Sequence, residues 1–198
     1  MADLTDNQAA QTVRIAGTDI TGVEINPITS TDMGNSRRGI EISQADELRT
    51  FNNNGQLFVG FSSVLAIGTV ETAAYLFKNP SGSGKQVKIV SIYQNTNGTG
   101  TVRIYKTPTV TANGTTITPQ SLRLQASPPA SIANVFSSPT VTSNGTFIMD
   151  FVSTAQSGSL GFELLGYLIL DANQTILITV QNSANNTNTD IGLQWLEI

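Results

Sequence analysis

The C-terminal stretch, residues 166–198, consists of three short apolar runs separated by polar residues that favour turns. The apolar residues of the middle and last runs are spaced two apart: Ile176, Ile178, Val180, Ile191, Leu193 and Trp195. In an extended chain, residues two apart lie on the same face, so each run has one apolar face and one polar face. This pattern predicts antiparallel strands that are packed on one side only.

The link between the last two runs, residues 183–190, is rich in Asn and Thr and too short for a crossover helix. We therefore expect these two runs to form a hairpin. Trp195 is the only tryptophan and lies three residues from the C-terminus. Because so large a side chain is expected to be buried, the C-terminal strand should lie in the core, covered by a second sheet from the upstream segments.

From residue 56 onward the upstream segments also read as short strands and turns. The expected strands are 57–65, 69–78, 86–94, 101–107, 115–124, 146–153 and 167–170. Asn-Gly dipeptides beginning at Asn97, Asn113 and Asn144 lie between such runs. Asn-Gly accepts the positive φ angles of a tight hairpin turn, so each dipeptide predicts a hairpin.

Two stretches interrupt the strands. Residues 125–139 contain three prolines and predict a long surface loop with a small edge strand near residues 135–136. Residues 154–165 predict a second loop, in which Phe162, Leu164 and Leu165 belong either to the core or to an apolar contact surface.

Roughly eight or nine short strands, long crossing loops and no substantial helix predict an all-β fold. The expected architecture is an antiparallel β-sandwich, and among sandwiches a jelly roll, with an extended N-terminal arm. Strand counting leaves an immunoglobulin-like topology open. No repeat of 20–50 residues is apparent, which argues against a propeller or a solenoid.

The N-terminal segment differs in composition from the rest. Residues 1–60 hold 8 of the 14 acidic residues and 4 of the 10 basic ones, which leaves 6 of each for the remainder. We expect an extended arm over residues 1–55, with a short hairpin over the alternating pieces Val13/Ile15 and Val23/Ile25 and then a short helix. Ser43 is expected to cap this helix, with Asp46 reaching back in a capping box. A sandwich domain is expected over residues 56–198. The apolar residues of the arm, the candidates for binding a partner, are Val13, Ile15, Val23, Ile25 and Ile28.

These few apolar residues cannot form a core of their own. A lone two-stranded hairpin is marginally stable in water, so the arm is expected to become ordered on a partner surface. The alternative is a disordered tail, which low hydrophobicity combined with charge also favours.

The sequence has no cysteine and no histidine. Disulfides, thiolate metal sites, cysteine nucleophiles, histidine bases and Ser-His-Asp triads are therefore excluded within it. A net charge of -4 provides no basic surface for nucleic acid, and no apolar run approaches the roughly 18 residues of a membrane span. The acidic start, MADLTDNQAA, does not have the pattern of a secretion signal. We expect no cofactor, no nucleic-acid partner and no membrane partner.

Two sets of residues are of types that catalytic sites use. NPSGSGKQ, residues 79–86, lacks the first glycine and the final Ser or Thr of a phosphate-binding loop, so it predicts a turn. Glu71, Asp150 and Glu163 are of the type that a histidine-free hydrolase needs, but no spacing brings two of them together. They are expected to be surface acids.

Tyr75, Tyr93 and Tyr105 are of the type that stacks on sugars or bases, but each lies within an apolar strand. Buried or half-buried packing is therefore expected for all three. No EF-hand spacing for calcium is present, and no residue is nominated as catalytic.

The opening QTVRIAGTDITGVEINPITSTDMG resembles the N-terminal arm of tailed-phage virion proteins, in which an extended V-x-I-x-G-x-D-x-x-G-x-E-x-N-P-I-type segment precedes a β-sandwich. TILITVQNS and DIGLQWLEI resemble the terminal hairpin of phage jelly-roll domains. The resemblance implies a non-enzymatic capsid decoration (cement) protein that binds and stabilises a phage capsid, with the arm clamping neighbouring subunits. Its partners would be the major capsid protein or another virion protein.

Such proteins are often trimers or dimers, so the resemblance also implies a homo-oligomer, made in the host cytoplasm and located on the capsid surface. Other functions stay open: an accessory protein of the neck, tail or baseplate, or a carbohydrate- or receptor-binding sandwich that uses loops 125–139 and 153–166. A hydrolase with two acids is the remaining alternative.

Overall fold

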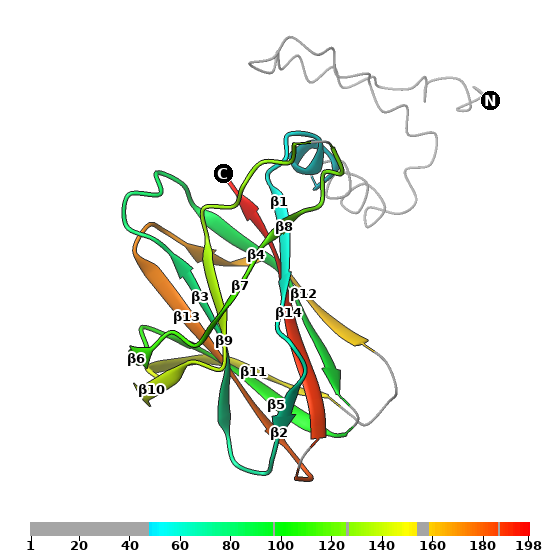
Figure 1. Ribbon diagram of the computed structural model, residues 1–198, viewed down its shortest axis with the longest axis vertical. Helices are drawn as coiled ribbons and strands as arrows, with labels where there is room; N and C mark the ends of the chain where they lie inside the picture. Colours follow the sequence, from blue (N-terminus) through cyan, green and yellow to red (C-terminus); the bar gives the residue numbers. More distant parts are fainter. Residues whose placement is uncertain (1–47, 97, 126, 154–158, 186) are drawn as a thin grey trace, which may run out of the picture. The chain divides into compact units, whose positions relative to one another are not determined.

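The computed structural model describes residues 48–96, 98–125, 127–153, 159–185 and 187–198 (Figure 1). It divides the protein into two units, residues 1–46 and 47–198, and the description below concerns the second unit. The expected hairpin of the arm and the expected cap at Ser43 and Asp46 lie outside the described residues. The expected domain limits, 1–55 and 56–198, stay a prediction.

The described residues form an antiparallel β-sandwich, as the alternating sequence predicts. The first sheet has the order β12-β4-β14-β1-β8, with β2 also paired to β14. Its strands are β1 Leu57–Phe61, β2 Leu65–Ile67, β4 Val87–Thr96, β8 Gln120–Ser121, β12 Ser159–Leu170 and β14 Thr187–Glu197.

The second sheet has the order β11-β5-β13-β3-β9-β7. Its strands are β3 Thr72–Asn79, β5 Gly100–Lys106, β7 Thr115–Ile117, β9 Asn134–Ser137, β11 Thr146–Ser153 and β13 Gln174–Asn182. A separate two-stranded ribbon pairs β6, Thr109–Ala112, with β10, Thr140–Ser143. Figure 1 shows this ribbon beside one end of the second sheet.

The core lies between the two sheets and is centred on Trp195, which is fully buried, as the sequence predicts. Its indole ring lies edge-on to Phe77 of the second sheet, with ring centroids 5.0 Å apart, and stacks on Phe58 of the first sheet at 6.2 Å. Tyr75 is fully buried beside this cluster, and its hydroxyl donates a 2.9 Å hydrogen bond to the carbonyl of Gly60. Aromatic side chains from both layers thus join the sheets through one residue near the C-terminus.

Burial raises the pKa of the Tyr75 phenol far above its usual value of 10.0. The folded state keeps this proton, while the unfolded state releases it near pH 10. The contribution of Tyr75 to the free energy of unfolding is therefore fully present below that pH and is lost as the pH rises above it. We expect the loss to reach about 1.4 kcal/mol per pH unit. Urea unfolding across this alkaline range should show a shallower decline for Tyr75→Phe than for the wild-type protein. Tyr93→Phe is the control, and an unchanged slope in Tyr75→Phe would contradict the assignment.

The expected hairpin between the last two strands is wrong. β13 lies between β3 and β5 in the second sheet, whereas β14 lies between β1 and β4 in the first. The middle of each strand has an apolar inner face, so each takes a central position in its own sheet, and both faces contribute to the core between the sheets. The polar link after Asn182 crosses between the layers and does not form a hairpin turn.

Two of the predicted Asn-Gly hairpins are also wrong, and the third, at Asn97, begins outside the described residues. Asn113–Gly114 joins β6 to β7 and Asn144–Gly145 joins β10 to β11, and in each case the two strands belong to different sheets. Both glycines do have a positive φ, of 89°. Only the glycine of each dipeptide has the predicted positive φ, and the asparagine does not. The dipeptides lie at corners where the backbone leaves one sheet for another.

These two corners belong to a short repeat. The expectation that the sequence has no repeat of 20–50 residues is therefore corrected. TPTVTANGTT, residues 107–116, recurs as SPTVTSNGTF, residues 138–147, an offset of 138 − 107 = 31 residues. The two copies pair reciprocally: β6 lies against β10, Thr146 lies opposite Lys106, and Thr115 lies opposite Ser137. Each copy makes the same contacts with the other, so the two copies are related by a local twofold axis. Because the pair is closed, it does not extend into a solenoid.

Three further expectations are corrected. The expected loop at 154–165 is largely strand, because β12 begins at Ser159 and pairs with β4, with a register shift between Glu163 and Leu168. β9 is not an edge strand, because it lies between β3 and β7. The expected strand 115–124 reduces to the short β7 and β8. Leu164 belongs to the core, while the side chains of Phe162 and Leu165 lie outside the described set.

Candidate functional site

The described part of the protein begins with a short helix, residues 48–53, that packs on the outer side of the first sheet. Side chains alternate along β14, so Leu196 faces away from the core that holds Trp195. Leu196, Leu57 and Val90 form a second buried cluster, against which Leu48 and Phe51 of the helix pack. We call the helix and this cluster the arm root, because it is the place where the N-terminal segment joins the body.

The helix is held in a fixed orientation at its end. Gly55 has a φ of 70°, and its N–H donates to the carbonyl of Asn52 at 2.9 Å. A Cβ added at Gly55 would lie 2.6 Å from Cγ of Pro129, so a loop covers this turn closely. The N–H of Gln56 donates to the carbonyl of Phe51, and the backbone then enters β1 directly. The arm root is therefore continuous with a central part of the first sheet.

Glu197, beside the arm root, is fully buried. Its carboxylate accepts hydrogen bonds from the Ser131 hydroxyl, from the backbone N–H of Ile132 at 3.1 Å and of Ala133 at 3.4 Å, and from the indole N–H of Trp195 at 3.1 Å. These donors satisfy a charge that would be costly to bury alone. The carboxylate thus ties the loop before β9 to the C-terminal strand.

Several apolar side chains of the body are exposed. Leu124, in the loop after β8, is 96% exposed. On the outer face of the first sheet, the ring of Phe61 is half exposed and lies 5.9 Å from the ring of Tyr93. A Cβ at Gly192 would be 2.2 Å from the Phe61 ring, so the ring lies directly over the glycine backbone.

A polar network covers the outer face of the second sheet. The Glu71 carboxylate accepts hydrogen bonds from Arg103 at 3.2 Å, Tyr105 at 2.8 Å, Thr179 at 2.6 Å and Asn144 at 3.3 Å. Burial, and then the bond to Glu71, raise the pKa of the Tyr105 phenol. Because four donors share this carboxylate, its evident role is to join strands.

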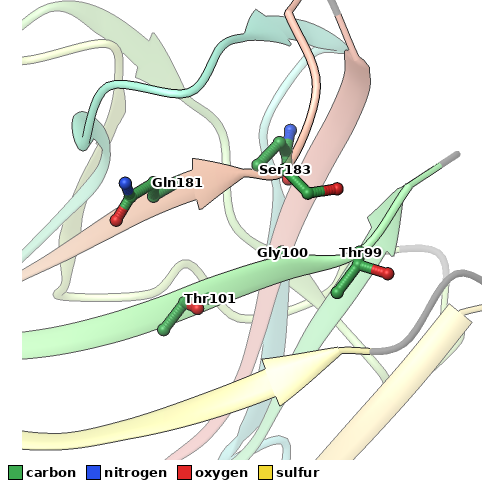
Figure 2. Close-up of a pocket in the computed structure, with 6 residues that line it drawn as sticks. Thr99, Gly100, Thr101, Gln181 and Ser183 are labelled. Atoms are coloured by element: carbon green, nitrogen blue, oxygen red, sulfur yellow. The ribbon is translucent and has the colours of Figure 1, made fainter.

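A depression of about 250 Å³ lies beside this network, at the end of β5 and β13 (Figure 2). Its lining residues are Thr99, Gly100, Thr101, Gln181, Asn182 and Ser183. All of them are uncharged, so the depression offers hydroxyl and amide groups but no acid or base. Such a lining suits a neutral polar ligand better than a catalytic step.

The structure places the other residues considered above as follows. Residues 79–86 form the turn between β3 and β4, as expected, and the Asn79 amide donates to the carbonyl of Lys85 at 2.9 Å. Tyr75 is buried and Tyr93 and Tyr105 are half buried, which confirms the packing prediction. Asp150 is exposed on β11 and pairs with Arg103 in the sheet register.

The predicted partner-binding residues all lie outside the described part of the protein: Val13, Ile15, Val23, Ile25 and Ile28. The arm root, the Glu197 contacts and the Glu71 network were not predicted from the sequence. A signal for Glu197 was present, because it is two residues from Trp195 and therefore on the same face of the strand.

Within the described ranges, no three acidic side chains come close enough to hold a metal ion. The same residues include no helix of the length and apolar character that crossing a membrane requires. No protein-family model matches the sequence, and the comparison with curated proteins found no match.

Proposed function

We propose that the protein is a non-enzymatic virion structural protein, a decoration or cement protein that binds and stabilises a phage capsid. The arm root is the observation that carries the proposal. A clamp resists separation only if its base is fixed to a body, and Leu48 and Phe51 pack against a buried cluster of the first sheet. The partner would be the major capsid protein or another virion protein, and the body a subunit of a trimer or dimer.

The physical basis of such a clamp is strand addition. Val13 and Ile15, and again Val23 and Ile25, alternate with polar residues, as expected of a segment that pairs with the edge of a neighbour's sheet. Main-chain hydrogen bonds then supply affinity, and alternate side chains enter pockets. Many copies on one shell reinforce each attachment by multivalency.

We also propose a jelly-roll topology for the body. The orders β12-β4-β14-β1 and β11-β5-β13-β3 support it, because each sheet takes four of the eight long strands and the first strand, β1, neighbours the last, β14. Two sheets of four strands are the jelly-roll arrangement. An inert body of this kind suits a mechanical role.

Removing residues 1–46 tests the clamp. We expect the truncated protein to fold, because the arm root and both sheets remain, and its affinity for undecorated capsids to fall by about a hundredfold or more, the scale of a lost second contact. Co-sedimentation with purified capsids measures the affinity, and circular dichroism checks the fold. A truncated body that binds as tightly as the full-length protein would rule out the clamp.

A full-length variant is the matched control for this truncation. It carries serine at the five apolar positions of the arm, which are Val13, Ile15, Val23, Ile25 and Ile28. If the alternating side chains make the contact, this variant should bind as weakly as the truncated protein. If it binds like the wild type, the partner-binding assignment of these five residues is wrong.

The depression in Figure 2 favours one second function, the binding of a neutral carbohydrate. Its six residues supply only hydroxyl, amide and main-chain groups. A glycan array with the full-length protein separates the two functions. Saturable binding that is lost in Gln181→Ala, with no affinity for capsids, would favour the carbohydrate module over the decoration protein.

A further inference from the structure

The two Asn-Gly corners of the repeat share one backbone but differ in their neighbours. Gly114 and Gly145 have the same φ of 89°. A Cβ added to either would meet a backbone carbonyl at almost the same distance, 2.1 Å and 2.2 Å. Both dipeptides are followed by threonine. The local twofold therefore presents the same short sequence twice, so that differences in reactivity between the two copies come from the surroundings.

At the first corner, a cation contacts the asparagine carbonyl. The ammonium group of Lys78 donates a hydrogen bond to Oδ1 of Asn113 at 2.6 Å, and it lies 5.8 Å from the centroid of the Phe136 ring. The residue before Asn113 is Ala112, which has no side-chain acceptor. Asn113 and Gly114 are both exposed, so water reaches them.

At the second corner, the contacts are of the opposite kind. The amide nitrogen of Asn144 donates to the Glu71 carboxylate at 3.3 Å. The backbone N–H of Gly145 donates to the hydroxyl of Ser143 at 3.2 Å. An anion therefore lies beside the asparagine side chain, and the nitrogen of the following residue is already bonded.

We propose that Asn113 is a site of spontaneous deamidation and that the fold protects Asn144. In this reaction the Gly114 nitrogen loses its proton to water or hydroxide and attacks Cγ of Asn113. Nδ2 then takes a proton from water, its bond to Cγ breaks and ammonia leaves, which gives a five-membered succinimide. Water adds to one ring carbonyl and opens the ring to aspartate or isoaspartate. Only water is consumed, and nothing is oxidised or reduced.

Lys78 favours the attack because negative charge develops on Oδ1 as the new bond between nitrogen and Cγ forms. A donor already placed at that oxygen stabilises this charge. The Glu71 carboxylate does the reverse at Asn144, since like charges repel, and the bond to Ser143 must break before the Gly145 nitrogen can attack. Both differences lower the reactivity of the second corner.

The two products differ as well. A carboxylate at position 113 would form an ion pair with Lys78, so the fold tolerates it. One such event changes the net charge from -4 to -4 − 1 = -5. A carboxylate at position 144 would face Glu71 and lose a hydrogen bond. The charge of the body is therefore expected to become more negative with age through the first corner.

Peptide mapping by mass spectrometry, after prolonged incubation of the full-length protein near neutral pH, measures both rates in one sample. We expect Asn113 to react about fivefold faster than Asn144, a difference of about 1 kcal/mol at 1.36 kcal/mol per tenfold. Lys78→Met should slow Asn113 by a similar factor and leave Asn144 unchanged. A serine hydroxyl at position 112 could accept the Gly114 N–H as Ser143 accepts that of Gly145, so Ala112→Ser should lower the rate of deamidation at Asn113. Ser143→Ala should raise the rate at Asn144.

The same measurement in concentrated urea is the control, because unfolding removes the surroundings and leaves two Asn-Gly-Thr sequences. The two rates should then become equal, and Lys78→Met should have no effect. Equal rates in the folded protein, a difference that persists in urea, or a folded Lys78→Met variant that reacts at the wild-type rate would each overturn the proposal.

Discussion

Replacing Trp195 with alanine should lower the free energy of unfolding by about 4 kcal/mol, within the usual range for a buried aromatic residue. Trp195 is fully buried and contacts Phe58 in one sheet and Phe77 in the other. Its removal leaves a cavity that a close-packed core fills only in part. Urea unfolding followed by far-ultraviolet circular dichroism measures the loss, because the substitution removes the only indole fluorophore.

Trp195→Phe is the matched control. It keeps much of the ring packing and loses the indole N–H that donates to Glu197. We expect a loss of about 2 kcal/mol, from partial packing and one hydrogen bond to a charged group. If Trp195→Ala cost less than about 1 kcal/mol, Trp195 would not be the contact that joins the two layers.

Replacing Glu197 with alanine is expected to cost about 3–5 kcal/mol, because several donors lose their acceptor at once. The carboxylate is wholly buried. Its removal leaves the N–H groups of Ile132 and Ala133, the indole of Trp195 and a serine hydroxyl without their acceptor. Each buried donor that lacks a partner costs about 1–3 kcal/mol. Urea unfolding again provides the measurement.

Lys85→Ala is the control for this prediction. The Lys85 ammonium lies 3.9 Å from the Glu197 carboxylate, and its side chain is 42% exposed. An exposed partner of this kind is worth about 0–1 kcal/mol, so Lys85→Ala should leave stability nearly unchanged. Equal losses in the two variants would mean that the ion pair, and not the set of buried hydrogen bonds, holds the loop before β9.

The alternation of side chains predicted much of the fold. A period of two decides which face of a strand is buried, so the inner faces of β13 and β14 and the burial of Trp195 followed from the sequence. The same period does not decide which strands are neighbours. The last two strands were expected to pair, yet each lies in a different sheet, because covering one apolar face with another outweighs the shortness of their link.

Asn-Gly predicted the positive φ of the glycine correctly, but it predicted neither the conformation of the asparagine nor the setting of the turn. The glycines at positions 114 and 145 have the expected positive φ. Whether such a residue ends a hairpin or turns a corner between sheets depends on distant strands, here β9 and β5, whose carbonyls approach the glycine backbone. Local chemistry does not contain that information.

The candidate site was less accessible to sequence reasoning. The cluster of Leu48, Phe51, Leu57, Val90 and Leu196 joins segments that are far apart in the sequence, and no local period connects them. The burial of Glu197 was not predicted either, although its spacing from Trp195 puts it on the inner face. A buried carboxylate next to a buried indole is a pairing that the alternation predicts once that face is assigned.

The most direct test of the central claim is an image of assembled phage particles that carry this protein, reconstructed at a resolution that traces the backbone. The proposed function predicts many copies over the capsid, with the sandwich on the outer surface and residues 1–47 extended onto neighbouring subunits. Density restricted to a few copies at the neck or tail would contradict the decoration role. Sandwiches on the shell whose N-terminal segments touch no other subunit would contradict the clamp.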